Sequence, residues 1–364
     1  MSVRNCIVAQ SGGPTAAINA SLAGVIKGVS ESGMYDTVYG SLNGITGILN
    51  QNLMNLSELM DGHPEYLDRL KVTPAMYLGS CRYKLPHYLD DDSSYVFLFK
   101  QFEQYHVEAF FYIGGNDSMD TVLKLSEYAK RIGSSVRIIG IPKTIDNDIW
   151  GTDVTFGFDS AVKVATETMD NIKTTASSHG RIFVVEVMGH KTGWVTLYSG
   201  IATGADIILI PEIPYDIKKI TSYIEKSDKK YLVIAAAEGI VEKEFSSLKN
   251  KERRQLLSEK NLKSQVEKLA LDIRTATDKE VRITIPGHTQ RGGSPTARDR
   301  IVSMQTGTAT ALNIINKNYG VMAAVINGKI VKVPLKEVAG KLKVVPADAE
   351  IILQAKEMGI CFGD

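Results

Sequence analysis

Cysteine is scarce in this sequence, and hydrophobic runs of membrane-spanning length are lacking. Its three cysteines, Cys6, Cys81 and Cys361, are far apart, which excludes a disulfide framework and a zinc-binding spacing. Apolar runs stop well short of the roughly 18 residues that a membrane span needs. The first residues also lack the pattern of a signal peptide, because residues 3–10 already resemble a strand. These absences predict a cytoplasmic protein in a reducing compartment that does not act in a membrane.

A surplus of either charge is also missing. Lys plus Arg is 42 and Asp plus Glu is 41, so the net charge is +1 and no general attraction to nucleic acid or anionic lipid is expected. Any binding of anions must therefore be local. The hydrophobic share of 44% and the charged share of 23% are typical of a globular protein and exclude disorder of the whole chain. A length of 364 residues predicts about two domains.

Short apolar runs alternate with helical patterns along the chain. The runs rich in Val and Ile are predicted to be strands, at residues 6–9, 109–113, 136–141, 182–187, 206–210, 232–236, 282–285 and 321–326. Between them, apolar residues such as Ile18, Leu22 and Val25 recur at helical spacing. This alternation predicts an α/β fold with two doubly wound, Rossmann-like parallel sheets. The most charged stretch, residues 242–268, is interpreted as a solvated helical insertion.

Glycine-rich or polar turns follow several of these strands, at residues 10–13, 114–117, 142–148, 188–190 and 286–293. Ligands of such folds bind at the carboxyl ends of the strands, so these turns predict one assembled site. Gly12 and Gly13 open a helix and would let backbone N–H groups approach a phosphate, although a simple tight turn is the alternative. For the second turn, which follows Gly115, the alternative is that Asp117 or Ser118 is simply a helix N-cap.

The segment from Lys143 to Asp148 carries the most specific chemistry. One of the carboxylates of Asp146 and Asp148 could accept a proton from a sugar hydroxyl while the other binds Mg²⁺. Lys143 suits phosphate oxygens, and Thr144 adds a hydroxyl. The alternative is an Asx-rich turn. Further cationic residues adjoin predicted strands or glycine turns and together favour a small, doubly phosphorylated ligand over isolated ion pairs: Arg82, Arg181, Arg282, His288 and Arg291.

These motifs resemble those of the 6-phosphofructokinase family over nearly the whole chain. The matching segments are Ser11-Gly12-Gly13 with Asn19, Leu78-Gly79-Ser80 with Arg82, Gly114-Gly115-Asn116-Asp117-Ser118, 142–148, Glu186-Val187-Met188-Gly189, Pro211-Glu212 and 287–295. The resemblance implies Mg²⁺-dependent transfer of a phosphoryl group to O1 of fructose 6-phosphate, which gives fructose 1,6-bisphosphate. It also implies a donor domain of residues 1–157 plus about 291–340, and a sugar-phosphate domain of residues 158–290 plus about 341–364. The active site is expected in the cleft between them.

The resemblance assigns roles residue by residue. Asp146 matches the catalytic base, and Thr144 lies near the transferring group. The donor is expected at Gly12, Gly13, Arg82, Gly115 and Asn116, and Mg²⁺ at Asn116 and Asp148. The sugar phosphate is expected at Thr144, Asp146, Arg181, Met188, Gly189, His190, Glu212, Arg282, His288 and Arg291. Because Arg181 and Arg282 match residues that reach in from a neighbouring subunit, a homodimer or homotetramer is expected.

Two positions bear on the phosphoryl donor. Pyrophosphate-dependent members of the family are similar to this chain at Asp117 and Lys143, where ATP-dependent members have glycine. A carboxylate at Asp117 would repel the α-phosphate of ATP, and Lys143 could stabilise pyrophosphate in the transition state. The sequence therefore predicts pyrophosphate as donor and phosphate as its product, in a reaction that runs usefully in both directions.

Two departures from the family pattern keep alternatives open. Asn116 stands where the family usually has a carboxylate, and His190 stands where it usually has arginine. The first alternative is an ATP-dependent 6-phosphofructokinase that tolerates Asp117 and Lys143. The second is a sugar-phosphate binding protein that has lost catalysis, against which the intact Asp146 and Asp148 argue.

Overall fold

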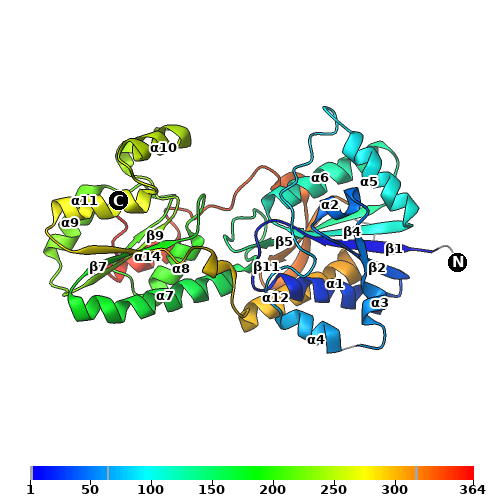
Figure 1. The fold of residues 1–364 in the computed structure, drawn as a ribbon, viewed down its shortest axis with the longest axis horizontal. Coiled ribbons are helices and arrows are strands. Elements are labelled where there is room, and N and C mark those ends of the chain that lie inside the picture. Colours follow the sequence, from blue (N-terminus) through cyan, green and yellow to red (C-terminus); the bar gives the residue numbers. More distant parts are fainter. Residues whose placement is uncertain (1–2, 64, 316–318) are drawn as a thin grey trace. The chain divides into compact units, whose positions relative to one another are not determined.

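A computed structural model describes residues 3–63, 65–315 and 319–364, and the chain divides into two compact units (Figure 1). The first unit comprises Met1–Ser160 and Arg291–Lys343, and the second comprises Ala161–Gln290 and Val344–Asp364. The chain thus passes between the units more than once. Both units contain a sheet covered by helices, so the predicted α/β class is confirmed.

The first unit contains an eight-stranded sheet in the order β12-β11-β5-β4-β1-β2-β3, with β6 paired to β5. Its strands are β1 (Asn5–Gln10), β2 (Thr37–Ser41), β3 (Leu53–Asn55), β4 (Val107–Gly114), β5 (Arg137–Thr144), β6 (Phe156–Gly157), β11 (Val321–Ile326) and β12 (Lys329–Pro334). Its helices are α1 (Ile18–Ser32), α2 (Ile45–Leu49), α3 (Leu56–Met60), α4 (Glu65–Val72), α5 (Ser93–Gln104), α6 (Asn116–Arg131), α12 (Ala297–Ala309), η3 (Thr310–Ile314) and α13 (Leu335–Val338).

The apolar strands of this unit are buried on both faces. Along β1, Cys6 and Val8 pack in one core with α1, whereas Ile7 and Ala9 pack in the other. This alternation follows from the two-residue period of a strand. Helices α1 and α12 cover one face of the sheet, and α5 and α6 cover the other (Figure 1). A continuous apolar run such as β1 is therefore what a doubly covered sheet requires.

The second unit has a four-stranded parallel sheet in the order β10-β7-β9-β8. Its strands are β7 (Ile182–Val187), β8 (Ile207–Leu209), β9 (Leu232–Ala237) and β10 (Val281–Thr284). Its helical segments are α8 (Trp194–Thr203), α9 (Ile217–Lys226), η1 (Lys243–Phe245), α10 (Asn250–Glu259), α11 (Gln265–Ala276) and α14 (Glu350–Glu357), while α7 (Phe158–His179) and η2 (Gly287–Arg291) lie at the junctions with the first unit. Within the core, α9 and α11 pack their apolar faces on β7 and β9.

The eight predicted strands all occur, and two of them, β7 and β11, have the predicted bounds. Four further strands, β2, β3, β6 and β12, were not predicted. The strands β3 and β12 pair antiparallel at the two ends of the first sheet, so this sheet is mixed rather than wholly parallel. β12 is exposed or half-buried along its length, and β6 has only two residues, so neither has the apolar run that marked the others.

In both sheets the strand order reverses beside a strand that ends in a glycine turn. β1 pairs with β2 on one side and with β4 on the other, and β7 pairs with β9 and β10. Such reversals are where open α/β sheets bind ligands. Within residues 3–63, 65–315 and 319–364, no helix combines the length and apolarity that membrane crossing requires.

Candidate active site

The glycine turn after β1 holds two cationic side chains of the first unit. Gly12 has a φ of 79°, and a Cβ there would lie 3.2 Å from Lys143 Nζ. A Cβ on Gly13 would lie only 2.4 Å from Arg291 Nη1. Both glycines therefore permit a close approach that a side chain would block. Gly12 and Gly13 are predicted to bind the donor, and the structure brings Lys143 and Arg291 to the same turn.

Lys143 is buried at the carboxyl end of β5, with 2% of its surface exposed. Its ammonium donates a hydrogen bond to the carbonyl oxygen of Gly13 at 2.7 Å. Burial, with help from the positive charge of Arg291, lowers the pKa of Lys143 to about 7, while Asp146 and Asp148 oppose the shift. The turn therefore contains a cation whose charge is poorly compensated by the protein. An anion bound there would compensate it.

The turn after β5 orients Asp146. The Asp146 backbone N–H donates to Thr144 Oγ1 at 3.1 Å, and the Thr144 hydroxyl donates to Asp146 Oδ2 at 3.5 Å. Asn147 adopts a left-handed conformation with a φ of 52°, and its Oδ1 accepts from Thr155 N at 3.0 Å and from Lys343 Nζ at 2.9 Å. These bonds hold a half-buried carboxylate at the same sheet edge as Lys143.

Helix α6 begins at this edge, directly after Gly115. The Gly115 nitrogen lies 3.8 Å from where a Cβ of Gly12 would be, so the amino end of α6 is close to the glycine turn. Asp117 lies further out, in the first turn of α6. Its carboxylate forms a 3.2 Å ion pair with Lys84, and both side chains are exposed. Arg82 is exposed in the same loop as Lys84.

The oxygen groups at this edge suit a magnesium ion that is shared with a bound phosphate. Across the part of the chain that the structure describes, no three His, Cys, Asp or Glu side chains are grouped to hold a metal ion. Magnesium usually takes only one or two protein carboxylates, together with water and substrate phosphates. Asp148, which is buried, and Asn116, the first residue of α6, offer the carboxylate and amide oxygens that such an ion would need.

In the second unit, the end of β7 is tied to the neighbouring strands. The Met188 N–H donates to the side-chain oxygen of buried Gln290 at 3.1 Å, and Gln290 in turn donates to the Gly287 carbonyl. The Gly239 N–H approaches the Gly189 carbonyl at 3.3 Å. Met188 and Gly189, both predicted to bind the sugar, therefore lie at a rigid junction. Gln290 was not singled out from the sequence, although it stands within a matched motif.

A groove of about 630 Å³ opens at this edge of the second sheet. It is lined by His190, one of the residues predicted to bind the sugar, by Glu186, the last residue but one of β7, and by Glu238, which directly follows β9. Glu238 was missed in the sequence. The sequence did contain a signal for Glu238, because this residue directly follows the buried apolar run 232–237. The predicted glycine-rich and polar turns of the site also come directly after such runs.

Two predicted sugar-binding residues lie elsewhere in this unit. The carboxylate of Glu212 accepts hydrogen bonds from the backbone N–H groups of Gly193, at 3.1 Å, and Val345, at 2.9 Å. Glu212 thus fastens the carboxyl-terminal segment, while its neighbour Pro211 lines the groove. His288 is exposed in η2 and is not among the residues that line the groove.

Arg181 and Arg282 lie at the opposite, amino end of the second sheet. Arg181 directly precedes β7, and Arg282 is the second residue of β10. Both pair with Glu280, Arg181 at 2.6 Å and Arg282 at 2.5 Å. A strand rises about 3.3 Å per residue, so the length of β7 separates Arg181 from Met188 by about 20 Å. The structure therefore does not bring these two arginines to the groove of the same chain.

Comparison with known proteins agrees with the fold and with the motifs. Residues 5–314 match the family described as Phosphofructokinase. A pyrophosphate-dependent phosphofructokinase from Marinobacter aquaeolei has a similar crystal structure, with a TM-score of 0.81 and 27% identity over 99% of this chain and 92% of that one.

The names of two curated relatives state different phosphoryl donors. An ATP-dependent 6-phosphofructokinase of Spirochaeta thermophila is 38% identical over 97% of this chain and 96% of its own length. A pyrophosphate–fructose 6-phosphate 1-phosphotransferase of Amycolatopsis methanolica is 38% identical over 66% of this chain and 70% of its own. The ATP-dependent name recurs among further relatives that are 36–40% identical. The family match covers most of this chain, and a relative is similar to it over 97% of its length. This chain therefore belongs to the phosphofructokinase family.

Proposed function

We propose that the protein transfers a phosphoryl group from pyrophosphate to O1 of fructose 6-phosphate, with Asp146 as general base. Membership of the family supports phosphofructokinase-type phosphotransfer. Pyrophosphate as the donor is the part that we propose in addition. In the proposed reaction the Asp146 carboxylate takes the proton of the 1-hydroxyl while that oxygen attacks phosphorus in line. The bond between phosphorus and the bridging oxygen breaks, phosphate leaves, and fructose 1,6-bisphosphate remains.

The observation that carries the choice of pyrophosphate is the buried ammonium of Lys143 against the glycine turn, 2.7 Å from the Gly13 carbonyl. A fixed cation at this point would stabilise charge that develops on the leaving phosphate without help from a nucleotide. Asp117, in the first turn of α6, would oppose the additional phosphate of ATP. Magnesium, held by Asp148 and Asn116 together with phosphate oxygens, would neutralise part of the donor's charge.

ATP is the second candidate donor, and the names of the curated relatives favour it over pyrophosphate. The name of a relative that is 38% identical does not say which residues stand at two particular positions. This chain has Asp117 and Lys143 at the two positions that bear on the donor. We therefore place pyrophosphate first and ATP second.

Initial rates distinguish the two donors. Fructose 1,6-bisphosphate formation would be measured with Mg²⁺ and either pyrophosphate or ATP, and the reverse reaction with fructose 1,6-bisphosphate and phosphate. We expect the larger kcat/KM with pyrophosphate and measurable turnover in both directions. Activity with ATP alone would replace pyrophosphate by ATP. Tight sugar-phosphate binding without turnover would instead indicate a binding protein.

The pH profile should reveal Lys143. With its pKa lowered to about 7, the Lys143 ammonium loses its proton as the pH rises through neutrality. We expect kcat/KM for pyrophosphate to fall on the alkaline side of about pH 7, because this parameter reports the free enzyme. This alkaline decrease in kcat/KM should disappear in Lys143→Met, measured at saturating fructose 6-phosphate. An unchanged decrease in that variant would assign the titration to another group.

The placement of Arg181 and Arg282 supports a homo-oligomer in this proposal. Both lie at the amino end of the second sheet, so they would serve the sugar 6-phosphate of a neighbouring chain. Arg291 and His288 would supply the remaining cations. The first unit would then hold the donor, and the second would hold the sugar phosphate.

A further inference from the structure

The turn after β5 continues into a loop, residues 147–155, that lies against the last segment of the first unit. Lys343 is the final residue of that unit. Its backbone N–H donates to the Asp148 carbonyl at 2.9 Å. The preceding residue, Leu342, forms an antiparallel bridge with Ile149. A segment that is distant in sequence therefore runs alongside the loop.

The Lys343 side chain ties three points of this loop together. Its ammonium donates to Asn147 Oδ1 at 2.9 Å, to the Thr152 carbonyl at 2.9 Å and to the Asp153 carbonyl at 2.8 Å. A lysine ammonium has three N–H donors, and these three acceptors converge on it. The donors of a guanidinium lie in one plane, so arginine would not reproduce this arrangement. The geometry therefore suits lysine in particular.

The far end of the loop is fixed to strand β11. Thr152 Oγ1 accepts a hydrogen bond from the Val325 N–H at 3.0 Å. The Asp153 N–H donates to the Val325 carbonyl at 2.8 Å. Lys343 thus joins a point that the sheet already holds to the residue that directly follows Asp146.

That residue, Asn147, adopts a backbone conformation that has to be held. Its φ of 52° lies in the left-handed region, which asparagine tolerates better than most residues but still at some cost. Asn147 Oδ1 accepts from the Thr155 N–H at 3.0 Å and from Lys343. These two bonds fix the direction in which the chain leaves Asp146, and with it the orientation of the Asp146 side chain.

We propose that Lys343 is a positioning residue, which acts through Asn147 to hold the Asp146 carboxylate where it accepts a proton. This inference rests on the proposed function, in which Asp146 is the general base. It extends the site to a residue beyond residues 5–314, the part of the chain that matches the family. A displacement of about 1 Å can lower the rate of a catalysed step by about 100-fold, so the effect of Lys343 falls on kcat.

Two variants remove the link from its two ends. In Lys343→Met, kcat should fall by about 10–100-fold with the donor that the wild type uses. The KM for fructose 6-phosphate should change by less than about threefold, because substrate binding is retained. Asn147→Gly removes the acceptor, and glycine adopts a positive φ readily, so this variant should fold and show the same pattern. In the double variant, the loss of kcat should match the larger single loss, because both changes act through one contact.

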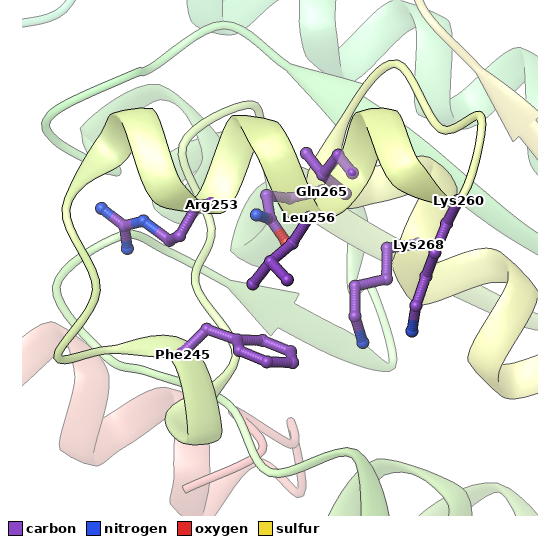
Figure 2. A pocket seen from close by; sticks show the side chains of 7 residues that line it. Phe245, Arg253, Leu256, Lys260, Gln265 and Lys268 are labelled. Atoms are coloured by element: carbon purple, nitrogen blue, oxygen red, sulfur yellow. The ribbon is translucent and has the colours of Figure 1, made fainter.

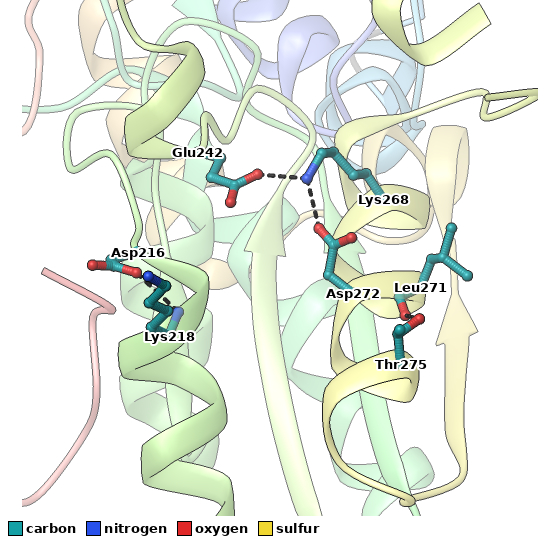
Figure 3. Close-up of polar contacts among 7 residues, drawn as sticks. All are labelled: Asp216, Lys218, Glu242, Lys268, Leu271, Asp272 and Thr275. Carbon is teal, nitrogen blue, oxygen red and sulfur yellow. Dashed lines mark hydrogen bonds and ion pairs between the residues drawn. The ribbon is translucent and has the colours of Figure 1, made fainter. Parts of the chain in front are cut away.

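The matched control is Lys268→Met, the same chemical change at a buried ammonium of the second unit. Lys268 lies 5.2 Å from the ring centre of Phe245, and both residues line a cavity of about 40 Å³ (Figure 2). It pairs with Glu242 at 2.5 Å and with Asp272 at 2.6 Å (Figure 3). Breaking these pairs should lower the free energy of unfolding and leave kcat at saturating substrate close to that of the wild type.

Trp150 lies within the loop and reports on its motion without turnover. The Lys341 ammonium is 5.9 Å from the centre of the Trp150 ring, and Trp194 is the other tryptophan of the chain. In a Trp194→Phe background, time-resolved fluorescence anisotropy therefore measures the mobility of Trp150 alone. We expect a larger fast component of the decay in Lys343→Met than in the background protein, and no change in Lys268→Met.

Unchanged anisotropy of Trp150 in Lys343→Met would overturn the proposal, and so would an unchanged kcat in this variant. A loss of kcat that Lys268→Met reproduces would assign the effect to stability and would also overturn it. If the wild type turns over fructose 6-phosphate with neither donor, the proposed function fails. The anisotropy comparison then still decides whether Lys343 orients the loop.

Discussion

Replacing Asp146 by asparagine should lower kcat by about 10²–10⁴-fold, which is the usual contribution of a general base. Asparagine keeps the size of the side chain and can still meet Thr144, whose hydroxyl lies 3.5 Å from Asp146 Oδ2. It cannot accept the proton of the attacking hydroxyl. The KM for fructose 6-phosphate should change by much less than kcat, because binding does not require this proton transfer.

The matched control is Asp120→Asn, the same chemical change in the same unit. Asp120 pairs with Lys124 on the surface of α6 at 2.7 Å, and its side chain is about half exposed. Such pairs contribute little, so this variant should keep wild-type kinetics. Turnover of Asp146→Asn close to that of the control would show that another group accepts the proton.

Replacing Lys143 by methionine should lower kcat/KM for pyrophosphate by about 10²–10³-fold, the typical loss when one preorganised donor is removed. Methionine fills the buried space without the charge. The double variant Lys143→Gly/Asp117→Gly should lose pyrophosphate activity in the same way and should also relieve the repulsion of ATP. Initial rates with both donors would be compared, with Lys124→Met as the control lysine. Unchanged pyrophosphate kinetics would remove Lys143 from the donor site.

The stability of Lys143→Met should change in the opposite direction from its activity. The folded-state pKa of about 7 lies below the ordinary 10.5, so the unfolded chain binds the extra proton between these two values. The wild-type free energy of unfolding should therefore rise with pH across this window. At neutral pH and below, the charged lysine costs at most about 5 kcal/mol, which methionine removes in exchange for one hydrogen bond. Thermal unfolding at several pH values would measure this difference.

The sequence predicted those features that local pattern determines. Apolar runs such as 182–187 identified strands because burial on both faces requires them, and glycine turns identified the ligand edge. Lys143 and Asp146 could be grouped because they share one turn. Partners that are distant in sequence could not be predicted. Nothing in the sequence places Arg291 against Gly13, since that contact depends on how α12 returns to the first unit.

The contacts of Glu212 and Glu238 could not be predicted from the sequence either. Both follow strands of the second unit, but only the folded chain shows that backbone N–H groups bind Glu212 while Glu238 faces the groove. The charged stretch 242–268 is a further example. Composition indicated an exposed helix, whereas only the folded chain shows that Arg253 and Arg254 of α10 also line the groove.

The arrangement of Arg181 and Arg282 has a consequence for mixtures of chains. Both arginines share Glu280 at the amino end of a sheet whose other end carries Met188. If each site borrows these cations from its neighbour, a chain with a defective base and a chain with defective arginines fail for different reasons. A hybrid assembly of the two would contain one intact site composed of the sound parts of each. Two inactive proteins could then recover activity on mixing, as complementing alleles do in a cell.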